Sequence, residues 1–567
     1  MSKRVLVVGG VAGGASTAAR VRRLDESAEV VMFERGPHVS FSNCALPFHL
    51  SGIVENSDNL VLMSPEQFKK QYNIEAHVNS EVVDVDATKQ EVTIKNTLTG
   101  ELSTDHYDEL MLAPGASPIV PQSIEGINQQ HVFTVRNVVD IKKIAAFVED
   151  NNVKNIAVIG AGFIGLEVAE NFRLADKNVT IIEAANQVMA PFDYDMAQIL
   201  HKEIHDHGVE LILEDALKTV GTDKVILNSG KEVTAEVVIM AIGVRPETGL
   251  AKKIGVELNE RGAIKVDHNY HTNLPHVYAV GDAIEVTHML TKKRTQLTMA
   301  FPAQMQARAA ADDMYGRTNH NPGVIGSSVV QCFNLNAACT GMNEKELQAE
   351  GIAYDIAYVI PKDKVGLMPD AKPIYFKLIY ATPSGKIMGA QAIGLGNADK
   401  RINVIATAIT LGGTLEDLAS LELAYSPMYA TPKDAVNFAA LVGLNVLNGE
   451  FKQVPVTQVR SLVESGACII DARERPEFQE GHIKGAVNIP LSEFRNRLDE
   501  IPTDRPVYVH CLSSQRSYNM VRALGNMGYT NVYNMVGSFL GVCMYEYFND
   551  VTTGREPIVT NYRFDLL

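Results

Sequence analysis

The sequence predicts an α/β protein with two doubly wound parallel sheets, followed by an α+β domain and a third α/β unit. Three observations carry this prediction. An apolar strand runs into a glycine-rich turn and then a helix near the N-terminus, and the same pattern returns near residue 155. From about residue 326 a sequence with strand-like patterns precedes a sequence with helical patterns, and a last strand–loop–helix unit follows residue 456. A chain of 567 residues is long enough for three to four such domains.

The first strand–turn–helix unit begins with the apolar run Arg4–Val8. The glycine-rich turn Gly9–Gly14 follows, and the helical pattern extends to about Arg23. The next predicted strand ends at Glu34, an acid at the carboxyl end of a parallel strand. Val11 stands where the dinucleotide fingerprint has its middle glycine, so this turn by itself is an incomplete match.

The second unit, with strand Asn155–Ile159 and a helix to about Ala175, carries the complete fingerprint. Gly160 is expected to make the tight turn, Gly162 to let the backbone approach a pyrophosphate, and Gly165 to let the helix pack on the strand. The helix N-terminus then faces the anion.

Glu183 follows the next strand of this unit, where a carboxylate can accept a hydrogen bond from a ribose 2′-hydroxyl. Ala184 and Ala185 come next, so no arginine stands ready for a 2′-phosphate. The spacing therefore predicts an NADH site rather than an NADPH site.

Composition excludes several other classes. The net charge of −16 argues against a nucleic-acid partner, and no apolar run reaches the ~20 residues of a membrane-spanning helix. The N-terminal glycines fit a strand–turn–helix better than a signal peptide. Six scattered cysteines, without a CxxC pair or metal-site spacing, favour a reducing, cytoplasmic location, and no metal is expected.

Two later segments complete the first fingerprint: Leu112–Gly115, and Val277–Asp282, which ends in an acid. With the Gly9–Gly14 turn they resemble the FAD-binding set of the two-dinucleotide-fold flavoprotein reductases, over residues 1 to about 445. The resemblance implies that Glu34 holds the adenosine ribose of FAD and Asp282 its ribityl chain. The FAD contacts that it implies are Gly9, Gly14, Glu34, Ala113, Gly115 and Asp282.

A single cysteine, Cys44, follows the first fingerprint, and no second cysteine lies nearby. Pro47 suits the first turn of a helix, so Cys44 is expected near a helix N-terminus, where a thiolate is favoured. The run Ser40–Pro47 closely resembles the CoA-disulfide reductases. A reductase with one cysteine needs a second sulfur from a small thiol, or oxygen as a sulfenic acid.

Ser16, Arg20 and Arg23 are spaced i, i+4, i+7 and share one face of the first helix, which could hold the phosphates of CoA. In the resemblance, Ser40 and Asn43 also contact CoA. The family completes its site from a second subunit, so the resemblance implies an obligate homodimer. The partner would supply Tyr425, near the reacting sulfur, and Lys433, toward CoA.

Two positions depart from this family. Leu367 stands where a second tyrosine is typical, and Gln304 stands where histidine or asparagine is usual. Both departures bear on which sulfur compound is the substrate.

The last unit has its own candidate nucleophile. Strand Val507–His510 leads to Cys511 in a loop that ends at Arg516, and a helix is expected from Ser517. Loop amides at a helix N-terminus form an anion nest that suits a cysteine persulfide. The segment resembles the rhodanese domain, although Ser514 stands where many active loops have glycine. Further matching motifs are Asp471–Arg473, Phe478–Ile483 and Gly485–Pro490.

Together the resemblances imply a flavin-dependent NADH reductase of CoA persulfide, polysulfide or CoA disulfide, with a rhodanese domain that handles sulfane sulfur. The catalytic residues would be Cys44, Tyr425, Cys511 and Arg516. The implied domains are FAD-binding at 1–115 and 249–325, NAD(H)-binding at 116–248, dimerisation at 326–448 and rhodanese at 456–551. Residues 450–455 are expected to form a short linker between the last two domains.

Two alternatives stay open. In one, the chain is an NADH oxidase or peroxidase, and Cys44 cycles through a sulfenic acid. In the other, the tail is a non-catalytic sulfur-sensing or docking module.

Overall fold

The computed structural model describes residues 2–564, which form two compact units. The first unit comprises the chain up to Ala184 together with Ile212–Val324. The second comprises Ala185–Leu211 together with the residues from Ile325 onward. The two parallel sheets predicted from the glycine turns lie in the first unit, and an antiparallel sheet and a last parallel sheet lie in the second. The predicted fold class is confirmed.

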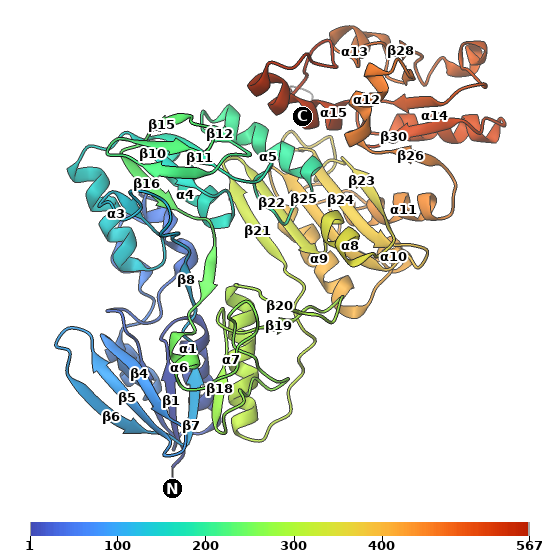
Figure 1. Cartoon of the computed structure of the whole chain (residues 1–567). Coiled ribbons are helices and arrows are strands. Elements are labelled where there is room, and N and C mark those ends of the chain that lie inside the picture. The colour runs from blue at the N-terminus through green and yellow to red at the C-terminus, as the bar shows by residue number, and fades with distance from the viewer. Residues whose placement is uncertain (1, 565–567) are drawn as a thin grey trace. The chain divides into compact units, whose positions relative to one another are not determined.

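The first parallel sheet is built around the N-terminal strand. Its strands, in spatial order, are β18 (Val277–Ala279), β7 (Glu109–Leu112), β1 (Arg4–Val8), β2 (Glu29–Phe33) and β3 (Glu75–His77). β1 pairs in parallel with β2 on one side and with β7 on the other. Figure 1 labels β1 and β7 next to each other. Val5, Leu6 and Val7 are completely buried. Such a continuous apolar run is typical of a strand covered on both faces of its sheet.

Helices α1 (Ala12–Leu24) and α7 (Ala300–Met314) pack against each other beside this sheet. Helix α2 begins at a capping box in which Ser64 and Gln67 each accept from the other's backbone N–H. The other elements here are η1 (Asn43–Ala45), η2 (Pro47–His49), η3 (Ser57–Leu60), α2 (Pro65–Tyr72), α6 (Gly249–Lys253), antiparallel strands β4 (Ser80–Asp86), β5 (Glu91–Asn96) and β6 (Leu102–His106), and the pair β19 (Val286–Thr287) and β20 (Arg294–Thr295).

The second parallel sheet follows the complete fingerprint. Its strands, in order, are β11 (Asn178–Ile182), β10 (Asn155–Ile159), β16 (Val237–Met240) and β9 (Val132–Phe133), and β12 (Glu210–Ile212), where the chain returns to this unit, is the edge strand beside β11. Its helices are α3 (Val138–Asp150) and α4 (Phe163–Leu174). Smaller antiparallel pieces are β13 (Leu217–Val220), β14 (Lys224–Leu227) and β15 (Glu232–Thr234), and the pair β8 (Ala116–Pro118) and β17 (Val244–Pro246).

The antiparallel sheet of the second unit has the order β21 (Ser328–Cys332), β22 (Leu335–Gly341), β25 (Ile387–Gly394), β24 (Ile374–Ala381) and β23 (Tyr354–Val359). All five strands lie beyond residue 326, in the part of the sequence that was predicted to be rich in strands. α9 packs on β22 and β25, and α11 packs on β23 and β24. The helices of this part are α5 (Tyr194–Asp206), α8 (Glu344–Glu350), α9 (Ala398–Leu411), α10 (Leu415–Ser420) and α11 (Ala435–Leu447).

The last sheet is parallel, with the order β26 (Lys452–Val454), β30 (Val532–Met535), β29 (Val507–His510), β27 (Cys468–Asp471) and β28 (Val487–Asn488). Its helices are η4 (Val456–Gln458), α12 (Val459–Glu464), α13 (Arg475–Glu480), η5 (Phe494–Asn496), η6 (Leu498–Glu500), α14 (Gln515–Asn526) and α15 (Ser538–Thr553).

The expectation of a short linker at 450–455 is wrong. Residues 452–454 form β26, which pairs in parallel with β30. Phe451 and Val454 are buried in the cores on either side of the sheet, and this burial makes the segment an edge strand instead of a free connection.

The last sheet and its helices contact the rest of the second unit mainly where α15 packs on α5. The ring of His201 on α5 lies 5.0 Å from that of Phe548 on α15, and Tyr194 meets Tyr545 edge to face. Gln453 of β26 donates to the carbonyl of Ile356 on β23, at 2.9 Å. Sequence reasoning did not anticipate these contacts.

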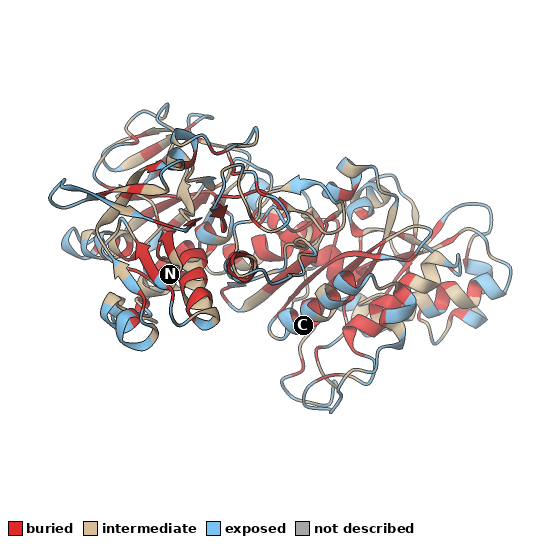
Figure 2. Cartoon of the chain, turned by 90° about the horizontal axis from the view of Figure 1, so that it is seen from below, coloured by how far each residue is buried: buried red, intermediate tan, exposed pale blue. Residues whose placement is uncertain are grey.

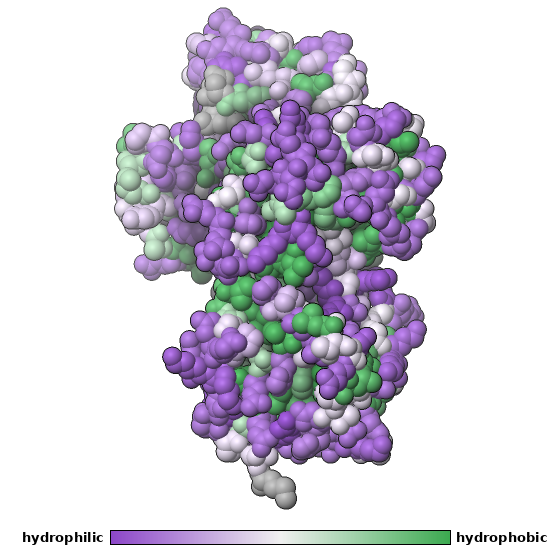
Figure 3. Space-filling view, turned by 90° about the vertical axis from the view of Figure 1, so that its left-hand side faces the viewer, coloured by the Kyte–Doolittle hydropathy of each residue, from purple (hydrophilic) through white to green (hydrophobic). Residues whose placement is uncertain are grey.

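The strands of the central sheets are buried, and the exposed residues concentrate in loops and on outer helix faces (Figure 2). On the face in Figure 3 hydrophilic side chains predominate. Among residues 2–564 no helix combines the length and apolar character that crossing a membrane requires.

Candidate active sites

The N-terminal fingerprint depends on glycine at two places. A Cβ on Gly9, whose φ is +101°, would lie 2.2 Å from the carbonyl oxygen of Ala113. A Cβ on Gly14 would lie 1.8 Å from the carbonyl oxygen of Gly9, so the helix can approach the strand only without a side chain. Val11, the departure from the fingerprint, is the N-cap residue of α1.

The predicted flavin contacts gather at the carboxyl ends of the parallel strands. Glu34, directly after β2, accepts hydrogen bonds from the backbone N–H groups of Gly10 (2.9 Å) and Gly36 (2.8 Å). Ala113 and Gly115 follow β7, and a Cβ on Gly115 would meet nothing within 4 Å. The structure brings these residues together as predicted.

Asp282 follows β18 at the same edge of this sheet, and burial raises its pKa to about 6. A hydroxyl that donates to this carboxyl would stabilise its ionised form. The site therefore fits a ligand with a polyol chain, as FAD has.

The second fingerprint has the geometry of a pyrophosphate site. A Cβ on Gly160 would lie 2.5 Å from the carbonyl of Ala241, and one on Gly165 would lie 2.0 Å from the carbonyl of Gly160. At Gly162, the N-cap of α4, a Cβ would meet no atom within 4 Å. The space in front of this helix N-terminus is open, as an anion of a dinucleotide requires. Glu183, one residue beyond β11, accepts from the N–H of Ala161 at 2.8 Å.

Cys44 lies in the short 3₁₀ turn η1, and Pro47 opens the next one, η2. Pro47 does begin a helix, but this helix and the turn that holds Cys44 are short 3₁₀ elements. The expectation of a favoured thiolate is wrong, because the surroundings raise the pKa of Cys44. Cys44 is exposed, yet the surrounding protein atoms desolvate its thiol and raise its pKa, and the charges of Glu167 and Asp282 raise it further. A 3₁₀ turn of three residues has too small a dipole to offset two carboxylates.

Glu167 is a functional candidate that sequence reasoning missed. It lies on α4, the helix that packs on η2, and Ser51 donates to Asn171 of the same helix at 2.6 Å. Burial, with a contribution from Glu170, raises the pKa of Glu167 to about 7. An acid in the helix after a dinucleotide turn is the only sequence signal of this residue, and many structural glutamates give the same signal.

A cavity of about 380 Å³ opens along the basic face of α1. Of the residues predicted to contact CoA, Ser16, Arg20, Arg23 and Ser40 line this cavity, whereas Asn43 is not among the lining residues. Arg20 donates to Asp312 at 2.8 Å, so this carboxylate offsets part of the positive charge.

The other walls of this cavity were not anticipated as a group. Arg308 on α7 adds a third guanidinium, and Phe68 and Tyr72 of α2 add an aromatic side. Gln304, the departure noted in the sequence, lines the same space. The cavity suits an elongated ligand with phosphate groups and apolar parts.

Tyr425 and Lys433 belong to the second unit, in the segment between α10 and α11. Lys433 is exposed. Tyr425 is 47% exposed, its neighbours Met428 and Tyr429 are exposed too, and Leu367 is 86% exposed. Neighbouring exposed apolar side chains are typical of a surface that another protein covers.

Cys511 directly follows β29 and is 1% exposed. Its backbone N–H donates to the hydroxyl of Ser538 at 3.1 Å, and the hydroxyl of Ser517 lies 3.6 Å from its Sγ. Ser514, the N-cap of α14, has a φ of +75°, a conformation that favours glycine. Its hydroxyl bonds to the carbonyl of Met535 and to Ser538, at 3.1 Å each, and these bonds hold the turn without glycine.

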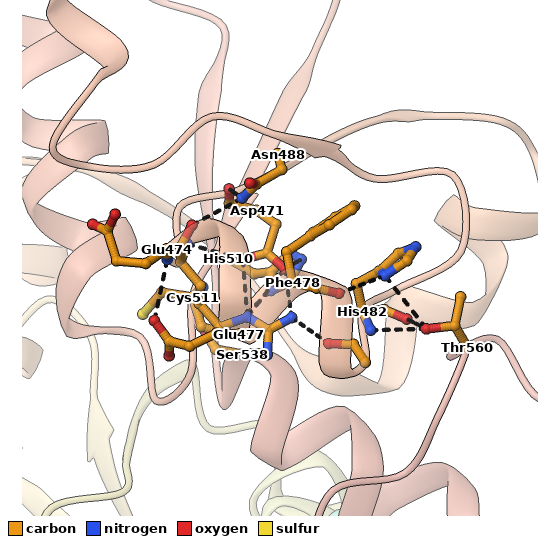
Figure 4. Close-up of polar contacts among 12 residues, drawn as sticks. Asp471, Glu474, Glu477, Phe478, His482, Asn488, His510, Cys511, Ser538 and Thr560 are labelled. Atoms are coloured by element: carbon orange, nitrogen blue, oxygen red, sulfur yellow. Dashed lines mark hydrogen bonds and ion pairs between the residues drawn. The ribbon is translucent and has the colours of Figure 1, made fainter.

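The base of this loop is a buried ion pair (Figure 4). The Arg473 Nε donates to both carboxylate oxygens of Asp471 at 3.0 Å, and both residues are fully buried. Asn488 donates to the backbone carbonyls of both residues. Burial lowers the pKa of His510, which keeps this neighbouring imidazole neutral.

Arg516 lies at the end of the Cys511 loop, and its guanidinium is paired with Glu477 of α13 at 2.6 and 2.7 Å. Sequence reasoning identified Arg516 but not Glu477, which directly precedes the Phe478–Ile483 motif.

The other four cysteines are free and at least partly buried. Burial raises the pKa of Cys339 to about 11 and that of Cys543 to about 12, so both thiols stay protonated. Among the described residues one acidic group, Asp193, Asp195 and Glu344, is compact enough for a metal ion, but the ammonium of Lys377 bridges its carboxylates.

Family profiles match almost the whole chain. The pyridine nucleotide-disulphide oxidoreductase profile matches residues 3–307, its dimerisation domain matches 327–436, and the rhodanese-like domain matches 455–544. The first match spans more than half of the chain, which therefore belongs to the pyridine nucleotide-disulphide oxidoreductase family. The chain is an oxidoreductase with FAD and a pyridine nucleotide as cofactors, and it carries a C-terminal rhodanese-like domain.

The relatives bear out the resemblances found in the sequence. Coenzyme A disulfide reductase of Staphylococcus epidermidis is 32% identical over 435 residues, which cover 76% of this chain and 98% of the relative. The reduced CoADR-RHD of Bacillus anthracis is 42% identical, with a TM-score of 0.93 over 96% of this chain and 99% of that one. A NAD-dependent persulfide reductase from A. fulgidus is 33% identical, with a TM-score of 0.90 over 95% and 99%.

Proposed function

We propose that this protein uses NADH to reduce the sulfane sulfur of CoA persulfide or polysulfide, and the disulfide of CoA. One observation carries the proposal. Cys44 is the sole cysteine before residue 332, and the chain that bears it also forms a cavity with the guanidinium groups of Arg20, Arg23 and Arg308. The printed names of the Staphylococcus and A. fulgidus relatives, a coenzyme A disulfide reductase and a persulfide reductase, support the same chemistry.

The chain's own residues would hold the cofactors as follows. Glu34 and Asp282, with the turns at Gly9 and Gly115, would bind FAD, and the open N-terminus of α4 with Glu183 would bind NADH. The bound flavin supplies the two-electron redox chemistry, and the protein supplies position and electrostatics.

Cys44 is proposed to rest as a mixed disulfide with the thiol of CoA. Reduction of this S–S bond, with the two electrons that the bound cofactors would supply, releases CoA as a thiolate that takes up a proton and leaves Cys44 as a thiolate. The Cys44 thiolate then attacks a sulfur of the substrate. A new S–S bond forms on Cys44 while the bond of the incoming disulfide or persulfide breaks, and the leaving thiolate or hydrosulfide takes up a proton. Glu167, with a pKa of about 7, is placed to hold that proton near Cys44.

The active site is proposed to be completed in a homodimer. The exposed apolar segment with Tyr425, Met428 and Tyr429 would be covered there, with Tyr425 near the reacting sulfur and Lys433 toward CoA of the other subunit. The match to the family's dimerisation domain supports this assembly. The tail is proposed to carry sulfane sulfur on Cys511. Six free cysteines favour a reducing, cytoplasmic location.

The deciding experiment is a mass spectrum of the purified protein under non-reducing conditions. We expect an adduct with the mass of CoA on the peptide that contains Cys44, and reductant should remove it. A protein without this adduct that turns over peroxide faster than CoA persulfide would contradict the proposal.

A second candidate is an NADH oxidase or peroxidase that cycles Cys44 through a sulfenic acid. It is supported by the likeness to a water-forming NADH oxidase from Lactobacillus brevis, which is 26% identical with a TM-score of 0.75 over 79% of this chain and 99% of that one. Steady-state rates with oxygen, peroxide and CoA persulfide separate the two functions.

A further inference from the structure

The loop around Cys511 contains one cation, Arg516. The guanidinium of Arg516 forms an ion pair with Glu477. Its Nη1 lies 2.6 Å from Oε2 of Glu477, and its Nη2 lies 2.7 Å from Oε1. Such a bidentate pair occupies one edge of the guanidinium, through one N–H of each terminal nitrogen, and is among the stronger side-chain contacts. Both side chains are about 30% exposed, so the pair lies at the mouth of the loop and not in the core.

Glu477 is itself held in place. Its Oε2 also accepts from the backbone N–H of Glu474, at 3.1 Å, as part of the capping box of α13. The guanidinium of Arg516 holds the pKa of Glu477 below its usual range, so this carboxylate is ionised at neutral pH. Turning Glu477 away from Arg516 would break the helix cap as well as the ion pair.

A second residue with a carboxylate, Glu474, lies beside the same loop (Figure 4). Ser492 donates to this carboxylate at 3.0 Å. The deeper charges cancel, because Arg473 is paired with Asp471 and burial keeps His510 neutral. One guanidinium and two carboxylates at the mouth therefore leave an excess negative charge next to Cys511.

This charge balance separates two classes of sulfur donor. Thiosulfate is a dianion and needs an unpaired cation, whereas a thiol persulfide carries at most one charge on its sulfurs. We propose that Glu477 is a specificity-determining residue, which neutralises Arg516 and thereby directs Cys511 to take sulfane sulfur from thiol persulfides instead of thiosulfate. The inference rests on the proposed sulfurtransferase function of the tail.

In the step itself, the Cys511 thiolate attacks the terminal sulfur of R–S–SH. A bond forms between Sγ of Cys511 and that sulfur, and the S–S bond of the donor breaks. The leaving R–S⁻ takes up the proton of the terminal sulfur, so that R–SH and a Cys511 persulfide anion result. The electrons balance without another oxidant or reductant. Ser517, in the first turn of α14, brings its hydroxyl to 3.6 Å from Sγ of Cys511, and the N-terminus of a helix favours the anion that remains.

The test compares two donors on the full-length protein, with cyanide as the common acceptor: thiosulfate and the persulfide of 2-mercaptoethanol. In Glu477→Gln the amide oxygen can still accept from the N–H of Glu474, so the helix cap is kept while the charge is lost. We expect kcat/KM for thiosulfate to rise about tenfold, which corresponds to ~1.4 kcal/mol, and that for the persulfide to change by less than about threefold.

Glu480→Gln is the matched control. It removes the same charge from the same helix, but Glu480 is paired with Arg563 and not with Arg516. The ratio of the two kcat/KM values should stay at the wild-type level in this variant. Equal falls for both donors in Glu477→Gln would assign Glu477 a purely structural role and overturn the inference.

The wild-type protein provides a second readout that does not depend on a variant folding. Raising NaCl from about 0.01 M to about 0.15 M shortens the Debye length from about 30 Å to about 8 Å, so it screens the charges at the mouth. We expect kcat/KM for thiosulfate to rise with salt in the wild type, because a repulsion is screened. A fall with salt in the wild type would contradict the inference. Sulfurtransferase activity no higher than that of Cys511→Ser with either donor would instead overturn the proposed function of the tail.

Discussion

The two candidate nucleophiles of this chain lie in opposite surroundings. Cys44 is exposed in a short 3₁₀ turn. Partial desolvation of its thiol by the surrounding protein atoms, together with the charges of Glu167 and Asp282, raises its pKa. Cys511 is buried at the start of a helix, with hydroxyls of two serines close to its N–H and Sγ. The polypeptide itself arranges the second site, whereas the first is proposed to be completed by bound groups: the cofactors, CoA and a second subunit. One chain can thus prepare one thiol for reaction by fixed loop geometry and, in the proposed mechanism, prepare another through bound ligands.

The strongest test of the comparison is Cys44→Ser. If Cys44 is the sole nucleophile of the reductase reaction, NADH-dependent reduction of CoA persulfide and CoA disulfide should fall by about 10³-fold or more in this variant. This is the scale for loss of a nucleophile. FAD content, measured by absorbance after denaturation, should stay unchanged because the fingerprint is intact. Wild-type turnover in this variant would remove Cys44 from the mechanism.

The second test is Cys511→Ser. We expect sulfurtransferase activity to fall by about 10²-fold or more, while NADH-dependent reduction of CoA persulfide supplied free in solution survives. The reason is that the two nucleophiles belong to different units of the chain. Loss of both activities would mean that Cys511 takes part in the reductase cycle and that the two sites are not independent.

The third test concerns the acid beside Cys44. Because burial raises the pKa of Glu167 from 4.5 to about 7, its carboxyl holds a proton below pH 7 and loses it above. We expect kcat of the wild type to decline as pH rises through about 7, and this limb to vanish in Glu167→Gln. Glu149→Gln, on the exposed side of α3, is the control and should keep the wild-type profile.

The same carboxyl links pH to stability. A carboxyl with a raised folded-state pKa stabilises the fold fully below pH 4.5, and this contribution is lost as pH rises through about 7. The loss is of the order of 3 kcal/mol. Above pH 7, Glu167→Gln should therefore have a higher Tm than the wild type, measured by scanning calorimetry of the holoenzyme. An equal Tm at pH 8 would show that bound cofactors already compensate this charge.

A smaller effect is expected in nucleotide choice. Glu183 would accept from a 2′-hydroxyl and repel a 2′-phosphate, so kcat/KM should favour NADH over NADPH by at least about tenfold, or ~1.4 kcal/mol. Equal values for the two nucleotides would mean that Glu183, which already accepts from the N–H of Ala161, serves the turn and not the ribose.

The smallest expected effect concerns Leu367 and the choice of substrate. Leu367 is 86% exposed and stands where a second tyrosine is typical of the CoA-disulfide reductases that the sequence resembles. Hydrosulfide is a more acidic leaving group than an alkyl thiol and needs less proton donation, so the wild type should prefer CoA persulfide to CoA disulfide. Leu367→Tyr should gain a few-fold in kcat/KM on the disulfide alone. A wild type that already prefers the disulfide would show that Leu367 does not set substrate choice.

Sequence reasoning was most successful where one local pattern has one structural solution. The two glycine turns, with the acids that follow their second strands, predicted both parallel sheets, and even the defective turn at Val11 keeps the geometry because Gly9 and Gly14 remain. It failed at 450–455, where the burial of Phe451 and Val454 creates an edge strand. Pairing with β30, some 80 residues away, is not visible in a six-residue window.

By itself the sequence determined the fold class and the basic face of α1, because short-range spacing fixes turns and helix faces. The resemblance of its motifs to known families pointed to the family and to both candidate nucleophiles. Only the tertiary structure decided the electrostatics around those nucleophiles. Glu167 beside Cys44 comes from another segment of the chain, as do Arg308 in the cavity and Glu477 on Arg516. A pKa or an ion pair depends on distances across the fold, and residue order fixes these distances only after the chain has packed.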